Sequence, residues 1–250
     1  MRYLLLFLCF SVTAAEKEIY INQAGNTNEV TITQSGTAGN KIQGLNGSTA
    51  SSITGNSNTV DIKQGSSSSV SPNLIEYTIL GGSNDIVLYQ DRLDVGTPAT
   101  STGGDHDIKL DIDGYTNNID IIQRSNYNTD GGHLVELEVT GDSNVVDLKQ
   151  IGDHSKTIDG TVSGDSNNIL VRQRGSEHKY LEFDLIGNGH DLDVTQAGEG
   201  NHNLDITLTY GSGSIDADIT QDSHTQNFSY TLEQTCYNPG GCGVSVTQSD

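Results

Sequence analysis

A ten-residue phrase recurs along the chain at nearly regular intervals. It reads Gly-Asp-Ser-Asn-Val-Val-Asp-Leu-Lys-Gln at 141–150 and Gly-Asp-Ser-Asn-Asn-Ile-Leu-Val-Arg-Gln at 164–173, and related phrases end at Gln34, Gln64, Gln90, Gln123, Gln196, Gln221 and Gln248. The gaps between successive phrase-ending glutamines range from 23 to 33 residues. A repeat of this length is typical of a solenoid, in which one unit cannot bury its own apolar face and needs its neighbours. A function would then reside in the stack rather than in a pocket.

Alternation within each phrase predicts a β-strand with one buried face. Side chains in a strand alternate between faces, so every second residue counted back from the glutamine shares its side. The positions two and four residues back are almost all Ile, Val or Leu, and the position six back is Asn in six phrases and His190 in a seventh. The residues between them are mostly Thr, Asp, Lys, Arg and Glu, which indicates that the opposite face is solvated.

Amides at both ends of this buried face predict two hydrogen-bonded ladders. Stacked strands lie about 4.8 Å apart, so identical amides can bond to one another along the stack. A shifted strand would leave buried amides unpaired at about 1–3 kcal/mol each, and the ladders would therefore set the register. The predicted ladder residues are Asn28, Gln34, Asn58, Gln64, Asn84, Gln90, Asn117, Gln123, Asn144, Gln150, Asn167, Gln173, Gln196, Gln221 and Gln248.

A second strand is expected before each phrase, joined to it by a tight turn. Apolar residues alternate at 75–79, 108–112, 135–139 and 181–185, and a glycine follows each run. Glycine suits a turn because it adopts positive φ at little cost. The sequence therefore predicts an all-β fold, a β-solenoid (β-helix) of about nine coils with two strands per coil, the first and last coils being irregular. Residues 16–250 are expected to form this single repeat domain.

The first fifteen residues, 1–15, are interpreted as a secretory signal peptide. Arg2 supplies the positive start, residues 4–10 are apolar and residues 12–15 are small. The apolar run is too short to span a bilayer, and Cys9 inside it is expected to be discarded. The remainder carries 11 basic and 33 acidic residues, which argues against nucleic acid and against anionic membrane surfaces as partners. We expect an exported chain that does not insert into a membrane.

Cys236 and Cys242 are expected to form a local disulfide, because the compartment is oxidising and only five residues separate them. No third or fourth ligand with metal-site spacing accompanies them. Asp111, Asp113 and Gly114 match only part of a calcium-binding loop and are interpreted as outward carboxylates and a turn glycine. The sequence contains no nucleophile elbow, zinc-protease helix or phosphate-binding loop. We therefore expect no catalytic residue, no metal and no cofactor.

Three histidines lie at similar distances before the turn glycines. His106 and His133 precede their glycines by eight residues, and His178 precedes its own by nine. They could stack into a metal-binding column, but we interpret them as solvated residues at a loop edge. His190 is interpreted as a substitute for asparagine in the ladder.

The repeated pattern resembles the curlin repeat, the unit of curli, which are the secreted amyloid fibres of Gram-negative bacteria. The family pattern Gln-x-Gly-x-x-Asn-x-Ala-x-x-x-Gln is matched by Gln23, Gly25, Asn28, Val30 and Gln34, with valine in place of alanine. The Asn-to-Gln half recurs through most of the chain. The pattern differs in the second strand, which mostly lacks a terminal amide, and the loops are longer and the chain more acidic than in a typical major subunit.

The resemblance implies secretion through the outer membrane and polymerisation into surface fibres used in cell adhesion and biofilm matrix. The implied partners are further copies of the chain or other curlin subunits, together with the curli-type secretion machinery. Two alternatives remain, a monomeric β-solenoid surface adhesin and a fibre nucleator or capping protein that binds partners through its variable loops. A glycan-active solenoid enzyme would need carboxylates paired across coils and an aromatic platform, and only 6% of residues are aromatic.

Overall fold

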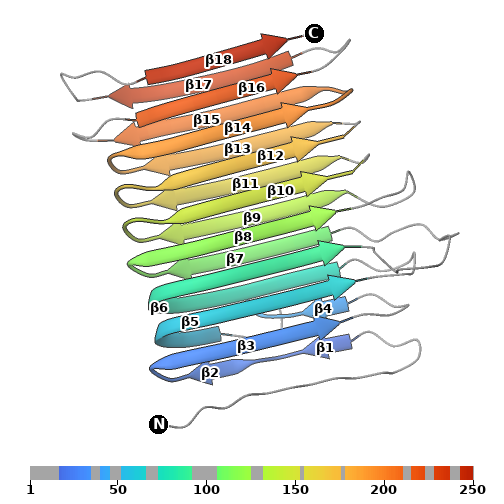
Figure 1. Cartoon of the computed structure of the whole chain (residues 1–250), viewed down its shortest axis with the longest axis vertical. Coiled ribbons are helices and arrows are strands. Elements are labelled where there is room, and N and C mark those ends of the chain that lie inside the picture. The colour runs from blue at the N-terminus through green and yellow to red at the C-terminus, as the bar shows by residue number, and fades with distance from the viewer. Residues whose placement is uncertain are drawn as a thin grey trace, which may run out of the picture.

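The structure is a computed structural model that describes residues 17–34, 40–45, 52–65, 73–91, 106–124, 132–152, 155–175, 178–210, 215–222, 228–236 and 243–249. The elements of these residues are all β-strands: β1 Lys17–Ile19, β2 Asn22–Ala24, β3 Thr27–Gln34, β4 Asn40–Ile42, β5 Ser52–Gly65, β6 Asn73–Asp91, β7 His106–Asp113, β8 Thr116–Arg124, β9 His133–Thr140, β10 Val145–Ile151, β11 Lys156–Ser163, β12 Asn168–Arg174, β13 Lys179–Ile186, β14 His190–Ala197, β15 His202–Tyr210, β16 Ile215–Asp222, β17 Phe228–Cys236 and β18 Gly243–Ser249. They stack along one long axis in the order of the chain (Figure 1).

The strands form two parallel sheets. The amide sheet, as we call it, contains the phrase strands, which pair in the order β3, β5, β6, β8, β10, β12, β14, β16 and β18. The second sheet contains the strands that precede them, among which β7, β9, β11, β13, β15 and β17 pair in that order. Strands β5 and β6 continue through the turn and belong to both sheets. The predicted β-solenoid with two strands per coil is therefore confirmed.

The number of regular coils differs from the expectation. The sequence predicts about nine coils with only the first and last irregular, but six are complete and regular, namely those formed by β6, β7–β8, β9–β10, β11–β12, β13–β14 and β15–β16. The first two coils are interrupted in the second sheet, where β1, β2 and β4 are three residues long each. The last coil, β17–β18, has no neighbour on its outer side among the described residues, and its inward side chains are exposed or half-buried.

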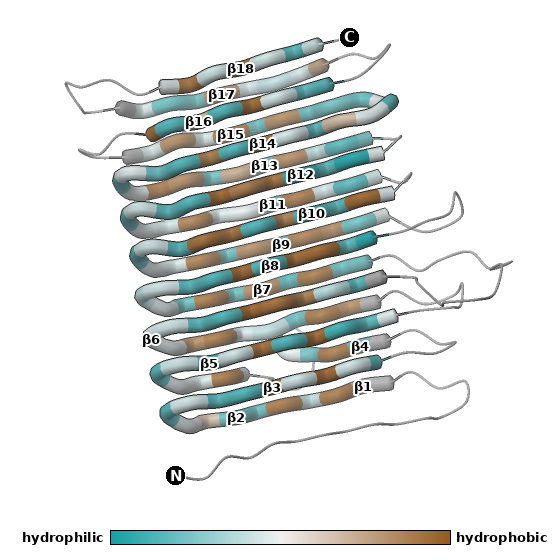
Figure 2. Tube along the Cα trace, viewed as in Figure 1, coloured by the Kyte–Doolittle hydropathy of each residue, from teal (hydrophilic) through white to brown (hydrophobic). Residues whose placement is uncertain are grey.

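The register is the same at every step of the amide sheet. Gln150, for example, lies opposite Gln123 on one side and Gln173 on the other. The apolar residues between the amides are buried throughout the regular coils, and each contributes about 1.5–3 kcal/mol of burial energy. Hydrophobic segments accordingly recur at the same place in successive strands (Figure 2). The fold is thus a stack of thin layers that share one continuous core.

In the coils whose turn the structure describes, the turn before the phrase has a glycine, and from the second coil on successive coils approach closely there. A Cβ on Gly141 would lie 1.5 Å from the carbonyl oxygen of Gly114. Two residues further on, Ser143 and Ser166 adopt φ values of 59° and 56°, in the left-handed region that non-glycine residues seldom occupy. The neighbouring coil holds this conformation, since the Ser143 N–H donates to the carbonyl oxygen of Asp165 at 2.7 Å.

The second sheet varies in side-chain size where the amide sheet repeats. Its middle inward row reads Tyr77, Leu110, Leu137, Gly160, Phe183 and Ile206 from one coil to the next. A Cβ on Gly160 would lie 2.3 Å from the ring of Phe183, so the ring occupies the space that the glycine leaves. Packing volume is therefore balanced between neighbouring coils.

Candidate functional site: two amide ladders along the stack

The glutamine ladder runs through the amide sheet from Gln34 to Gln248. At every step the Nε2 of one glutamine donates to the Oε1 of the glutamine in the preceding coil, at 2.8 to 3.0 Å. The predicted glutamine row is thus present. All its bonds point in one sense, which allows each amide to polarise the next.

The same amide groups also join the two sheets. Gln150 Nε2 donates to the carbonyl oxygen of Thr157 at 2.8 Å, and Gln173 Nε2 donates to that of Tyr180 at 3.0 Å. These carbonyls belong to the beginning of the second-sheet strand that follows in the chain. From Gln90 to Gln221 each glutamine therefore fixes both the step to its neighbour and the distance across the coil.

The asparagine ladder lies beside the turn and runs in the opposite sense. Each Asn Nδ2 donates to the Oδ1 of the asparagine in the following coil, at 2.7 to 2.9 Å, from Asn28 to Asn167. In Asn28, Asn117, Asn144 and Asn167 the same nitrogen also donates to the turn carbonyl of its own coil, for example from Asn117 to Gly114 at 3.1 Å. The turn glycine and the ladder asparagine are therefore one structural unit.

The two ladders end at different coils. In the asparagine row His190 follows Asn167, with 3.2 Å between Nδ1 of the ring and Nδ2 of the amide. The interpretation of His190 as a ladder substitute is therefore confirmed. Ile215 comes next in this row and ends the ladder. The glutamine row continues to Gln248, in the last described strand.

A buried basic column lies at the beginning of the second-sheet strands, and sequence reasoning missed it. It consists of His106, His133, Lys156, Lys179 and His202, which occupy one register position and are at most 2% exposed. The rings of His106 and His133 stack with centroids 4.8 Å apart, and their Nδ1 atoms are 2.9 Å apart. The interpretation of these two histidines as solvated was wrong. His178 is exposed, because Lys179 occupies the inward position in its coil.

Burial changes the ionisation of two members of this column. It lowers the pKa of Lys179 to about 8, and the ammonium donates to the carbonyl oxygen of Glu199 at 3.3 Å. It also lowers the pKa of His202, whose Nε2 lies 2.9 Å from the carbonyl oxygen of Gly198. His202 packs edge to face against Phe228 of the last coil. The column thus places ionisable groups inside an otherwise apolar sheet.

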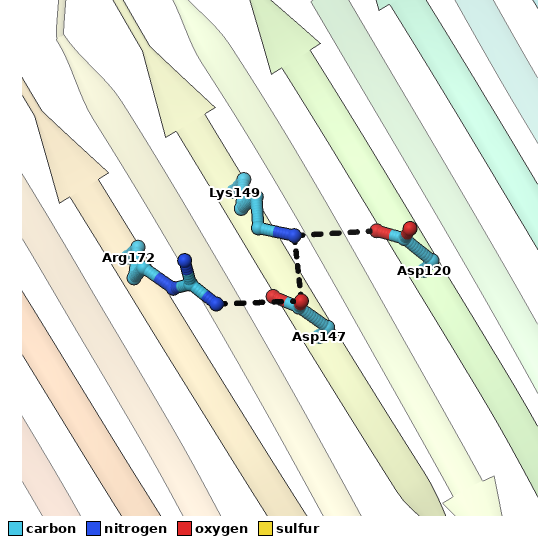
Figure 3. A network of polar contacts seen from close by, with 4 residues as sticks. All are labelled: Asp120, Asp147, Lys149 and Arg172. Atoms are coloured by element: carbon cyan, nitrogen blue, oxygen red, sulfur yellow. Dashed lines mark hydrogen bonds and ion pairs between the residues drawn. The ribbon is translucent and has the colours of Figure 1, made fainter.

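Charges on the outer face of the amide sheet form a small network. Lys149 lies between Asp147, at 2.6 Å, and Asp120, at 3.9 Å, and Arg172 reaches Asp147 at 3.5 Å (Figure 3). Burial raises the pKa of Asp120, and the Asp147 charge adds to this effect while Lys149 opposes it. Such half-exposed pairs contribute about 0–1 kcal/mol each. The network therefore balances charge locally between β8, β10 and β12 without fixing the fold.

Several sequence-based expectations fall outside the described residues. These include the signal peptide at 1–15 and Cys242, so the disulfide to Cys236 stays a prediction. Among the described residues, no three His, Cys, Asp or Glu side chains come together as a metal site would require. Asp111 and Asp113 point outward, as expected.

Comparison with known proteins identifies no family. No protein-family model, no curated protein and no solved structure matches the chain. In the part of the chain that the structure describes, no helix has the length and apolar character needed to cross a membrane.

Proposed function

We propose that this chain is an exported structural subunit of a curli-like extracellular fibre that supports cell adhesion and biofilm matrix. The observation that carries the proposal is the glutamine ladder, which extends to the first and last amide-sheet strands without a change of sense. At Gln248 the ladder can be extended, because the amide donates to Gln221 and its Oε1 is the acceptor for a further glutamine. Its chemistry serves stacking, which is what a fibre subunit requires.

Both ends of the described stack offer strand edges for further pairing. Within the described residues β3 pairs only with β5, and β18 pairs only with β16. Val244 and Val246 of β18 are half-buried and pack against the core from one side. An uncovered strand edge with inward apolar residues is a template for another chain. The ends therefore favour addition of a second copy.

The sense of the glutamine ladder favours head-to-tail addition. An incoming glutamine continues the ladder only if it donates to Oε1 of Gln248, as Gln248 donates to Gln221. The first coil of a second copy brings Gln34, whose Oε1 accepts from Gln64 and whose amide has the same orientation as the others. If the last coils of two copies met, Oε1 of one Gln248 would face Oε1 of the other, and neither could donate. Head-to-tail stacking therefore keeps every ladder bond.

A second amide pair supports the same junction. Gln23 and Gln234 occupy one inward row of the second sheet, which is aliphatic in every coil between them: Ile53, Ile79, Ile112, Val139, Val162, Leu185 and Leu208. In the single chain Gln234 is exposed and Gln23 half-buried, whereas an amide that became buried without a partner would cost about 1–3 kcal/mol. Head-to-tail stacking would bury the two amides against one another, where each can donate to and accept from the other.

The test compares fibre growth of residues 16–250 with that of two lysine variants in the last strand. Val246→Lys places a charge in the junction, although in the monomer this half-buried side chain can extend its ammonium to water. Thr247→Lys adds the same charge to the exposed outer face. We expect dye-positive fibres with a meridional reflection near about 4.8 Å from the parent chain and from Thr247→Lys, and none from Val246→Lys.

Other results would overturn the proposal. A parent chain that remains monomeric and dye-negative at high concentration would favour the adhesin. Equal growth of both variants would exclude the last strand as the point of addition.

A further inference from the structure

The end of the asparagine ladder contains a titratable group in place of an amide. His190 begins β14, is 2% exposed and contacts Asn167 through Nδ1. Its other ring nitrogen, Nε2, is buried and has no hydrogen-bond partner. The next residue in the row is Ile215, which offers neither donor nor acceptor. His190 therefore has one polar neighbour in the row, and that neighbour belongs to the ladder.

The orientation of Asn167 is fixed by its other contacts. Its Oδ1 accepts from Nδ2 of Asn144 at 2.9 Å, and its Nδ2 donates to the carbonyl oxygen of Gly164 at 3.0 Å. A flipped amide would bring its oxygen against the Gly164 oxygen and a donor against the donor of Asn144. Asn167 therefore presents an N–H to His190. Nδ1 of His190 must accept this bond, which assigns the ring as neutral with its proton on Nε2.

We propose that His190 is an acid-operated break in the asparagine ladder. Protonation places an N–H on Nδ1, opposite the N–H of Asn167, and replaces the last ladder bond with a contact between two donors. The amide cannot flip to accept, because Gly164 and Asn144 hold it. The step between β12 and β14 is then weakened beside the turn. This inference does not depend on the proposed fibre.

The surroundings of the ring oppose its protonation. Burial lowers the pKa of His190, and the Asp165 carboxylate in the turn of the preceding coil offsets this only in part. On the side of β16 the neighbour is Ile215, and the inward residues closest to the turn in β13 and β15 are the apolar Leu185 and Leu208. Asp165 is thus the charged group that acts on the ring, and desolvation outweighs it.

The lowered pKa of His190 sets the sign of the pH dependence of stability. A histidine whose pKa is lower in the folded chain binds its proton more readily when unfolded, so stability is lost as pH falls below the ordinary value near 6.5. For each such histidine the unfolding equilibrium constant rises by up to about tenfold per pH unit. Asp120 and Asp159 have raised pKa values and would add stability on acidification, so they cannot produce this loss.

The test uses the residue that the other coils place in this row. His190→Asn keeps an acceptor for Asn167 and cannot be protonated, and His178→Asn changes an exposed histidine of the same coil as a control. We expect the unfolding equilibrium constant in urea to rise more steeply from pH 7.5 to 5.5 in the parent chain and in His178→Asn than in His190→Asn. The difference should approach about tenfold per pH unit once the pH is below 6.5. Equal slopes in all three proteins would overturn the proposal.

NMR of the parent chain tests the proposal without a variant. The ¹⁵N shifts of the His190 ring in the folded parent chain should show the Nε2–H tautomer and a titration below pH 6.5. Amides of β12 and β14 should exchange faster than those of β8 and β10 once the ring is protonated, after correction for the intrinsic rate. Titration at or above 6.5, or the Nδ1–H tautomer, would contradict the assigned ladder end.

Discussion

The two sheets of the coil reach the same regularity by different means. In the amide sheet the Asn and Gln rows repeat nearly one residue type, the two rows between them are apolar throughout, and polar ladders fix the register at both ends of the strand. In the second sheet the middle inward row changes in size from coil to coil, and neighbouring residues such as Gly160 and Phe183 compensate for one another in volume. The amide sheet therefore specifies how the coils align. The second sheet follows the alignment and is tolerant of sequence as long as volume is conserved.

The largest expected effect comes from removing volume in the second sheet. Phe183 is fully buried, so Phe183→Ala should lower the free energy of unfolding by about 3–5 kcal/mol. Gly160→Ala should also destabilise, by about 1–3 kcal/mol, because its Cβ meets the ring. If volume is shared between coils, Gly160→Ala should cost less in a Phe183→Leu background. Urea unfolding of the four proteins of this cycle measures the coupling, and additive effects would contradict shared packing.

A smaller effect is expected from breaking the amide sheet at one step. Gln150→Ala removes the bonds to Gln123, Gln173 and the Thr157 carbonyl and should cost about 1–3 kcal/mol. Lys149→Ala on the outer face should change stability by less than about 1 kcal/mol, since its ion pairs are partly exposed. Chemical unfolding of both variants checks the ranking. Equal losses would mean that the ladder does not dominate this strand.

The buried basic column predicts that the stability of the chain depends on pH in the alkaline range. Burial holds the pKa of Lys179 at about 8, below the ordinary 10.5. Above pH 10.5 the lysine is neutral in both the folded and the unfolded chain, and burying it costs no charge. As pH falls from 10.5 to 8 the unfolded chain binds the proton first, so stability is lost. We expect the chain to become more stable between pH 8 and 9.5, and Lys179→Met to lose this rise. Lys149→Met, changed on the outer face, should keep it, and a rise that persists in Lys179→Met would assign it to other groups.

The amide sheet could be predicted from sequence because its spacing is constant. The phrase ends in glutamine, asparagine lies six residues earlier, and the turn glycine lies three before that, for instance at Gln150, Asn144 and Gly141. The register of every strand follows from that spacing alone. His190 could also be assigned, because it occupies the place of an asparagine.

The second sheet could be predicted only in part. Its apolar alternation is visible, but the basic residues at its edge look like ordinary loop residues. The same counting by twos would have placed them, since His106 lies two residues before Ile108 and Lys156 two before Ile158. The number of regular coils was overestimated because the phrase persists where the second-sheet strand is interrupted, as around β4. A regular phrase in the amide sheet does not ensure a regular strand in the second sheet.

The most direct test of the account is the register of the amide sheet itself. Thr195 and Thr220 face outward in β14 and β16 and lie opposite one another, whereas Asp218 lies two residues out of register with Thr195. Adjacent partners are about 4.8 Å apart, within disulfide range, and the offset pair is about 8 Å apart, beyond it. In oxidised monomer, peptide mapping should find the disulfide in Thr195→Cys/Thr220→Cys and not in Thr195→Cys/Asp218→Cys. Equal cross-linking of the two pairs, or linkage of the offset pair alone, would contradict a stack held in register by its ladders.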